Sequence, residues 1–292
     1  MVRRGLEPFW NFLEFGDRVV DKMKALAGRD EPLAVPPTHA VLGTPMLGPW
    51  PAGYKVAVFA NGCFWGSEKG IWRLPGGGIY TTAVGYCGGF TKNPRYDEVC
   101  SGRTGHTEGV QVVYDPKKIS FVDILRWFWE AHDPTQGMGQ GHDRGTQYRS
   151  GFYWFDDEQK ELVERSARAY QEELTRAGIN RKITTEMKPA SDFDQLFYYA
   201  EEYHQQYLAK PGSRPYCSAQ PLLIPLPLFD QWAPPALWHH APKLTKSFWD
   251  EHAPTPHCVV RAENEPIVWA PSQVQRAPPP LNPLAPLTPL TP

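Results

Sequence analysis

The sequence predicts an α/β (α+β) fold in which a mixed β-sheet covered by helices forms a two-layer α/β sandwich. Short apolar segments rich in β-branched residues alternate with longer segments whose apolar residues recur at helical spacing. The chain has 292 residues, 41% of them hydrophobic, so it can bury a substantial core. We expect a helix and irregular arm over 1–50, the main folded domain over 51–232, and a Pro-rich extension, largely irregular or disordered, over 233–292.

The individual elements follow from the same patterns in chain order. An amphipathic helix is expected over 6–26, followed by an irregular arm that lies over the domain and ends near Pro51. Ser120 with Asp123 is typical of a capping box, and Gly178 is expected to end a long helix. Strands are predicted at 54–60, 79–86, 110–114, 151–155 and 183–187, and helices at 63–74, 120–132, 157–177 and 200–209.

Charge and hydropathy argue against nucleic-acid binding and against a membrane-spanning segment. The formal net charge of −2 gives no electrostatic reason to expect nucleic acid or an anionic membrane as a partner. The most apolar run, 222–229, is too short to span a membrane and contains two prolines. Residues 271–292 hold eight prolines and one charge, which predicts a disordered tail. The N-terminus resembles neither a secretion signal nor a typical transit peptide, so we expect a cytoplasmic location, with a mitochondrion or plastid as the alternative. We also expect a monomer.

The cysteines indicate working thiols rather than a structural framework. Five occur, at positions 63, 87, 100, 217 and 258, and none forms a C-x-x-C pair. This fits a reducing compartment better than a disulfide scaffold or a zinc site. Cys87 and Cys100 are expected to be packed structural thiols. His106 and Glu108 form an H-x-E pattern, but no cysteine pair completes it, so we predict no metal.

Cys63 lies in a turn from a strand to a helix. The preceding residues are strand-like, and Asn61 is a candidate N-cap, which places Cys63 in the first helical turn. Unpaired backbone N–H groups and the helix dipole favour a thiolate at this position. A buried structural cysteine is the alternative. The flanking glycines, Gly62 and Gly66, indicate close approach by another group and favour reactivity.

The residues around this turn suggest a specific chemistry. Phe64 and Trp65 suit a small apolar group such as a methyl. Glu108 lies in an otherwise neutral stretch, and burial beside aromatic rings would raise its pKa and make it a proton donor. Tyr96 lies in a long loop that we expect to be functional, and Tyr148 offers a second phenol. Such groups could attack an electrophilic sulfur while protonating an oxygen bonded to it.

Several motifs together resemble the peptide methionine sulfoxide reductase A family. They occur in matching order over roughly 51–217, and their number makes the resemblance specific. The motifs are Gly62-Cys63-Phe64-Trp65-Gly66, Gly85-Tyr86-Cys87-Gly88-Gly89, Gly105-His106-Thr107-Glu108, His132-Asp133-Pro134-Thr135-Gln136, Gly145-Thr146-Gln147-Tyr148-Arg149-Ser150 and His204-Gln205-Gln206-Tyr207-Leu208.

The resemblance implies a two-layer α/β fold without metal or bound cofactor, and a set of catalytic roles. Cys63 would attack the sulfur of methionine-S-sulfoxide, in proteins or as the free amino acid, and become a sulfenic acid. Glu108 would protonate the departing oxygen, and Tyr96 and Tyr148 would hydrogen-bond it. Asp143 matches a supporting polar position in the same site.

The resemblance also implies how the substrate is held and how the enzyme is regenerated. Phe64 and Trp65 would receive the substrate methyl. Cys217 matches the resolving cysteine, which would form a disulfide with Cys63. Thioredoxin, or dithiothreitol in vitro, would then reduce that disulfide. The residues after Cys217 are Ser218-Ala219-Gln220-Pro221 rather than glycines, which departs from the family pattern. Cys258 is the candidate for a third, recycling cysteine.

Two other classes of function stay open at this point. A thiol peroxidase or redox sensor could use Cys63 and Cys217 without a sulfoxide pocket. A scaffold could bind a partner through 233–292. Within the predicted last helix, His204 and Tyr207 are expected to line or brace the site, and Tyr203 is expected to lie in the core.

Overall fold

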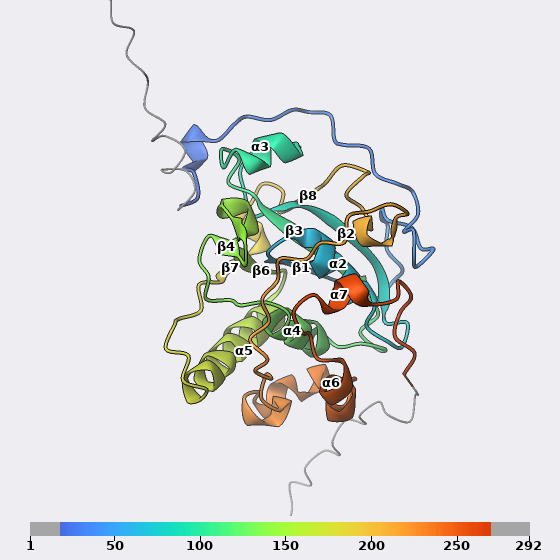
Figure 1. Cartoon of the computed structure of the whole chain (residues 1–292), viewed down its shortest axis with the longest axis vertical. Helices are drawn as coiled ribbons and strands as arrows, with labels where there is room; N and C mark the ends of the chain where they lie inside the picture. The colour runs from blue at the N-terminus through green and yellow to red at the C-terminus, as the bar shows by residue number, and fades with distance from the viewer. Residues whose placement is uncertain (1–17, 270–292) are drawn as a thin grey trace, which may run out of the picture.

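The computed structural model describes residues 18–269, and in this part of the chain a six-stranded mixed sheet forms the centre (Figure 1). The strand order is β7-β6-β1-β3-β2-β8, with β6 and β7 parallel and the other neighbours antiparallel. A separate hairpin pairs β4 (Gly139–Gln140) with β5 (Asp143–Arg144). The strands of the main sheet are β1 (Lys55–Asn61), β2 (Ile79–Cys87), β3 (Thr107–Tyr114), β6 (Ser150–Trp154), β7 (Glu186–Pro189) and β8 (Phe197–Tyr199).

Helices connect and cover these strands. The Ser120 hydroxyl accepts from the backbone N–H of Asp123 at 3.1 Å, and the Asp123 carboxylate accepts from the N–H of Ser120, which confirms the predicted capping box. The α-helices are α2 (Phe64–Trp72), α3 (Tyr96–Cys100), α4 (Phe121–Glu130), α5 (Asp157–Arg176), α6 (Lys246–His252) and α7 (Cys258–Arg261). Short 3-10 turns are η1 (Lys22–Lys24), η2 (Thr146–Tyr148), η3 (Ala190–Asp192), η4 (Tyr207–Ala209), η5 (Phe229–Gln231) and η6 (Pro235–His240).

The two faces of the sheet have different covers. Alternate residues of a strand point to opposite faces. In β1, Phe59 joins the cluster formed with the helices, whereas Val58 and Ala60 join a second cluster with Met46 and Leu196. The helical layer and the sheet thus form the predicted sandwich, and the irregular N-terminal arm packs on the other face.

The structure differs from the predicted elements at several places. Tyr96, predicted to lie in a loop, begins the short helix α3, and the strand predicted at 183–187 forms instead at β7 (Glu186–Pro189). In the described part of the 6–26 segment there is no α-helix, only η1, and residues 6–17 lie outside the described range. Residues 200–209 form turns and η4 rather than a helix, because the segment is held by hydrogen bonds to other parts of the chain and Gln206 is left-handed. The short strand β8 was not predicted from the sequence.

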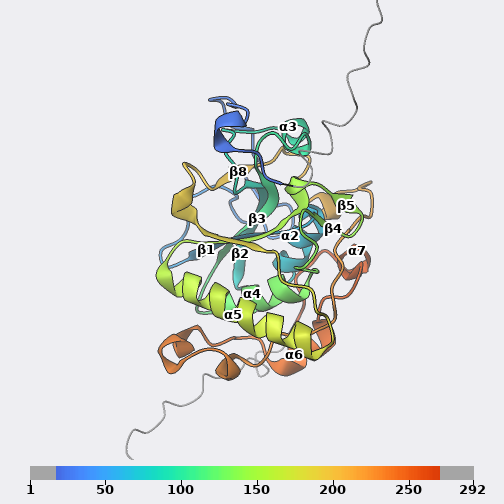
Figure 2. The ribbon, with the colours of Figure 1, turned by 90° about the vertical axis from the view of Figure 1, so that its left-hand side faces the viewer.

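Residues 233–269, here called the C-terminal extension, are not irregular throughout. They include η6, α6 and α7 and pack beside α4, α5 and α2 (Figures 1 and 2). The buried Asp123 carboxylate accepts from the backbone N–H groups of Lys243 and Leu244 at 2.8 and 3.1 Å. This segment is therefore packed on the domain, with short helices separated by irregular stretches. The tail beyond it, 270–292, lies outside the described residues.

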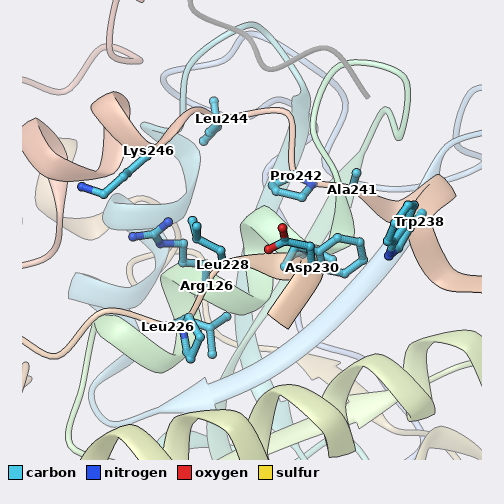
Figure 3. Close-up of a pocket in the computed structure, with 12 residues that line it drawn as sticks. Arg126, Leu226, Leu228, Asp230, Trp238, Ala241, Pro242, Leu244 and Lys246 are labelled. Atoms are coloured by element: carbon cyan, nitrogen blue, oxygen red, sulfur yellow. The ribbon is translucent and has the colours of Figure 1, made fainter. Parts of the chain in front are cut away.

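The extension also borders an open pocket of about 240 Å³, which α4 and residues 226–230 line on its other sides (Figure 3). Arg126, Trp238 and Leu244 are among the residues that line it. None of the residues predicted for the functional site lines this pocket. Between residues 18 and 269, no helix combines the length and the apolar character needed to cross a membrane.

Removing a buried aromatic side chain of the extension should destabilise the whole domain. Trp249 is 1% exposed and packs in the main core, with Arg126 4.9 Å from its ring centre. We expect Trp249→Ala to lower the free energy of unfolding by about 3–5 kcal/mol, measured by urea denaturation. Val268→Ala is the control, because Val268 is 96% exposed and should change stability by about 0.5 kcal/mol or less. Equal stability of both variants would contradict a packed extension.

Candidate active site

The sheet register brings the predicted residues to one end of three neighbouring strands. β1 runs antiparallel to β3 with Phe59 opposite Val110, so the end of β1 lies beside the start of β3. Glu108 is the second residue of β3, and Cys63 follows β1 by two residues. On the other side of β1, Ser150 pairs with Asn61, which places Tyr148 at the same end.

Cys63 is the N-cap residue of α2, with φ −54° and ψ 122°. The first helical N–H, that of Phe64, donates to the Glu108 carboxyl at 3.0 Å. The predicted N-cap, Asn61, instead accepts from the hydroxyl of Ser67. Glu108 therefore supplies the acceptor that the helix start needs, and its carboxyl is fixed next to the residue that bears the thiol.

The environment of Cys63 does not favour the thiolate, in contrast to the prediction. Burial raises the pKa of the Cys63 thiol well above its ordinary value, and the nearby Glu108 and Asp143 carboxyls act in the same direction. The backbone N–H of Trp65 acts the other way by hydrogen-bonding the sulfur. The helix start thus lowers the pKa as expected, but desolvation outweighs it.

Glu108 has the character expected of a proton donor. Glu108 is 2% exposed, and burial raises its pKa to about 8. The hydrogen bond from the N–H of Phe64 lowers this pKa, whereas the charge of the Asp143 carboxyl raises it. A carboxyl with this pKa is largely protonated at neutral pH. When Glu108 carries its proton, its charge no longer opposes ionisation of Cys63.

The two predicted phenols lie on the same side of the site. Tyr96 begins α3, where its backbone N–H donates to Glu201 at 2.9 Å. Burial raises the pKa of Tyr96 and of Tyr148, and Glu108 lies near enough to raise both further. Both phenols therefore keep their protons and can donate hydrogen bonds.

A tyrosine that sequence reasoning missed connects Asp143 to the predicted resolving cysteine. The hydroxyl of Tyr216 donates to the Asp143 carboxylate at 2.5 Å. Tyr216 immediately precedes Cys217, so the contact ties the β4–β5 hairpin to the segment that carries this thiol. The one signal in the sequence that could have pointed to Tyr216 is its position next to a cysteine in a coil.

A cluster of aromatic side chains includes Phe64 and Trp65, which follow Cys63 in the chain, and Tyr207. The ring of Trp65 stacks on Tyr207 with centroids 3.8 Å apart, and its indole N–H donates to Nδ1 of His204 at 3.0 Å. His204 and Tyr207 thus lie against the site, as predicted. Phe64 is fully buried with its ring 5.0 Å from His204. The prediction for Tyr203 is wrong, because it is 55% exposed.

The glycines that flank Cys63 allow two close approaches, which agrees with the sequence prediction. A Cβ on Gly66 would lie 2.7 Å from Sγ of Cys217, and a Cβ on Gly62 would lie 2.7 Å from the Cβ of Gln140. Cys217 therefore packs directly against the first turn of α2. Burial raises its pKa to about 11.

Cys258 lies in the same region. It lines a small pocket together with Gly66, Cys217 and Val259, and it contributes to the electrostatic environment of Cys217. The segment after Cys217 is held in place, since the N–H of Gln220 donates to Gln140 at 3.0 Å. Cys217 thus lies near both of the other predicted redox cysteines, since it shares this pocket with Cys258 and is close enough to Cys63 to raise the pKa of that thiol.

The remaining candidates have structural surroundings. Cys87 is fully buried in the second core cluster, as predicted for a packed thiol, whereas Cys100 is half-buried and hydrogen-bonds Tyr96. Nε2 of the buried His106 lies 2.8 Å from the carbonyl of Thr91. The ring is therefore held by the backbone rather than directed at Glu108.

Comparison with known proteins identifies the family. The family model described as peptide methionine sulfoxide reductase matches residues 55–224. The chain belongs to this family, and it is an oxidoreductase that reduces methionine sulfoxide. The sequence-based prediction of the family is thereby confirmed, as is the mixed-sheet fold.

Individual relatives agree with this assignment. The peptide methionine sulfoxide reductase MsrA of Salinispora arenicola is 52% identical over 206 residues, which cover 70% of this chain and 90% of the relative. That of Azotobacter vinelandii is 54% identical over 198 residues, covering 68% and 88%. The solved structure of methionine sulfoxide reductase A of Corynebacterium diphtheriae superposes with a TM-score of 0.61 at 45% identity, covering 68% of this chain and 93% of that one.

Proposed function

We propose that Cys63 is the nucleophile and Glu108 the general acid in reduction of methionine-S-sulfoxide. The observation that carries this assignment is the buried Glu108 carboxyl, with a pKa of about 8, bound to the first N–H of the helix that Cys63 caps. A protonated carboxyl at this place can donate to the sulfoxide oxygen while the cysteine sulfur approaches the sulfoxide sulfur.

The first step is balanced without any other reactant. A Cys63 sulfur–oxygen bond forms as the sulfur–oxygen bond of the sulfoxide breaks, so methionine is released reduced and Cys63 becomes a sulfenic acid. Glu108 gives its proton to the oxygen and regains one from the Cys63 thiol. The carboxyl thus returns to its initial state: the sulfenic acid carries the proton that Glu108 gave, and the thiol proton is now on Glu108.

The phenols and aromatic rings hold the substrate for this step. Tyr96 and Tyr148 donate hydrogen bonds to the sulfoxide oxygen, which fits their retained protons. Phe64 and Trp65 receive the substrate methyl. Asp143 positions the site by holding Tyr216.

Regeneration uses the thiol beside the first turn of α2. Cys217 attacks the sulfenic sulfur of Cys63, forms a disulfide and releases water. A thioredoxin dithiol then reduces that disulfide, either directly or after exchange to a disulfide between Cys217 and Cys258. The position of Cys258 in the pocket that Cys217 also lines supports the second route.

The stereochemical assignment is tested with the separated epimers of methionine sulfoxide. With thioredoxin, thioredoxin reductase and NADPH, the S epimer should be consumed and the R epimer left. The same selectivity is expected with a peptide substrate. Consumption of both epimers at comparable rates would contradict the proposed orientation of oxygen toward Glu108 and methyl toward Trp65.

Adding one methyl group at Gly66 should slow regeneration more than attack. The new Cβ of Gly66→Ala would lie 2.7 Å from Cys217 Sγ, so the sulfur must move. We expect the first molecule of methionine to form at nearly the wild-type rate in a single turnover, whereas steady-state turnover falls about tenfold or more. A stability cost of about 1–3 kcal/mol is expected from overpacking.

Cys217→Ser is the comparison for this measurement. It should also form one equivalent of methionine per enzyme and then stop or slow strongly. If both variants kept the wild-type steady-state rate, Cys217 would not be the resolving residue.

A further inference from the structure

Three potential metal ligands gather where the C-terminal extension meets α5. Glu158 lies in the first turn of α5, and His239 and His240 end η6. Figure 2 shows the extension lying along α5 on the side away from the sheet. One ligand atom from each residue lies within 4.8 Å of the other two. The cluster shares no residue with the site around Cys63.

Both imidazoles point at the same carboxylate. Nε2 of His240 is 3.0 Å from one Glu158 oxygen, and Nε2 of His239 is 3.2 Å from the other. The two rings are close, with centroids 4.2 Å apart and planes tilted by 41°. Each of the two neighbouring imidazoles thus directs its Nε2 to the Glu158 carboxylate rather than to solvent.

The spacing is close to that of a coordinated metal. Zinc binds histidine nitrogen and carboxylate oxygen at about 2.0–2.2 Å, which places neighbouring donors of a tetrahedron about 3.3–3.6 Å apart. The two Glu158 contacts are a few tenths of an ångström shorter, so small side-chain rotations would suffice. Hydrogen bonds between the histidines and Glu158 would give the same contacts without an ion, so the two cases differ in whether the protein binds a metal.

We infer that Glu158, His239 and His240 form a binding site for a divalent transition-metal ion, with zinc as the ion it suits best. Two imidazoles and one carboxylate suit zinc, and similarly copper or nickel, better than calcium or magnesium, which prefer oxygen ligands. Glu158 and His239 are more than half exposed, so water can complete the coordination and the ion can enter from solvent.

The inferred role of the site is to fasten the extension to the domain. η6 is a short 3-10 segment that begins at a proline, and Glu158 belongs to a long helix of the main domain. A metal bridge between them would bind the folded form in preference to the unfolded chain and stabilise it. The exposed position and the absence of shared residues separate this role from catalysis.

The test is zinc titration of untagged, chelator-treated protein by isothermal calorimetry. One zinc ion per chain is expected, and its binding should weaken at least about tenfold in His239→Ala, in His240→Ala and in Glu158→Gln, because loss of an outer-shell partner alone costs this much at other sites. Glu161→Gln, one turn further along α5, is the matched control and should bind as the wild type does.

Cobalt binding distinguishes this site from adventitious binding at the cysteines, because thiolates are also zinc ligands. The expected complex has weak visible bands and lacks the intense near-ultraviolet absorption of thiolate ligands. Zinc should also raise the melting temperature of the wild type and of Glu161→Gln, but not that of the His239→Ala, His240→Ala double variant. Absent binding, undiminished binding in the histidine variants, or a thiolate spectrum would overturn the inference.

Discussion

Cys63→Ser should lower the turnover of methionine sulfoxide by about a thousandfold or more, as happens when other enzymes lose their nucleophile. A serine hydroxyl at the N-cap of α2 can still meet the structural needs of the helix start, since serine is a favoured N-cap residue. The fold should therefore persist while the soft nucleophile is gone. The assay is formation of methionine from the S epimer with dithiothreitol as reductant.

The matched control is Cys87→Ala, which removes a thiol that lies in the second core cluster. It should cost some stability and leave the rate per folded molecule near that of the wild type. Retained activity in Cys63→Ser would show that another residue attacks the sulfoxide. A loss of activity in both variants with intact folding would contradict the assignment of Cys87 as a structural thiol.

Glu108→Gln should have the second largest effect on catalysis. Glutamine can still accept from the N–H of Phe64, so the local structure is retained, but it cannot protonate the sulfoxide oxygen. We expect the rate of the chemical step to fall by about 10²–10⁴-fold. Oxidation of Cys63 by hydrogen peroxide should change much less, and an equal loss in both reactions would show that Glu108 acts on the reactivity of Cys63 rather than on the sulfoxide oxygen.

The pH dependence gives a second result for the same variant. The folded-state pKa of Glu108, about 8, lies above its ordinary value of 4.5. Its donor form is thus present below pH 8, and wild-type activity should decline as pH rises through that value. In Glu108→Gln this decline should disappear from the remaining activity.

Stability should follow the same titration. A raised carboxyl pKa favours the protonated folded form, so its contribution to stability is full below pH 4.5 and is lost as pH rises through about 8. The free energy of unfolding of Glu108→Gln should therefore fall less over this range than that of the wild type. Parallel curves would contradict burial of an ionisable Glu108.

The sequence predicted most of the central sheet because its signals are local. The strands at β1, β2, β3 and β6 carry β-branched and aromatic residues, and α5 has both a helical apolar spacing and a terminal glycine. The segment 200–209 was predicted wrongly because buried contacts override its helical pattern. Its backbone N–H at Gln206 donates to the buried Glu68 at 2.8 Å.

The sequence predicted which residues lie together in the candidate site, but not the electrostatics of that site or the contacts that support it. Motif resemblance identified Cys63 and Glu108, whereas the direction of the Cys63 pKa depends on how deeply neighbouring chain buries the sulfur. The contact of Tyr216 with Asp143 joins residues 73 positions apart in the sequence. Such contacts leave no periodic signal, and the same reason explains why the order of the C-terminal extension was missed.

The most direct test is to identify the cysteine that becomes a sulfenic acid when the protein reduces the sulfoxide. In a Cys217→Ser, Cys258→Ser double variant, Cys63 has neither of the proposed partners, so its sulfenic acid should persist. The variant is given one equivalent of methionine-S-sulfoxide without reductant, labelled with a sulfenic-acid reagent, digested and analysed by mass spectrometry. We expect one methionine per chain and one label, on the peptide of Cys63. Methionine formed without that label, or with the label on Cys87 or Cys100, would contradict it.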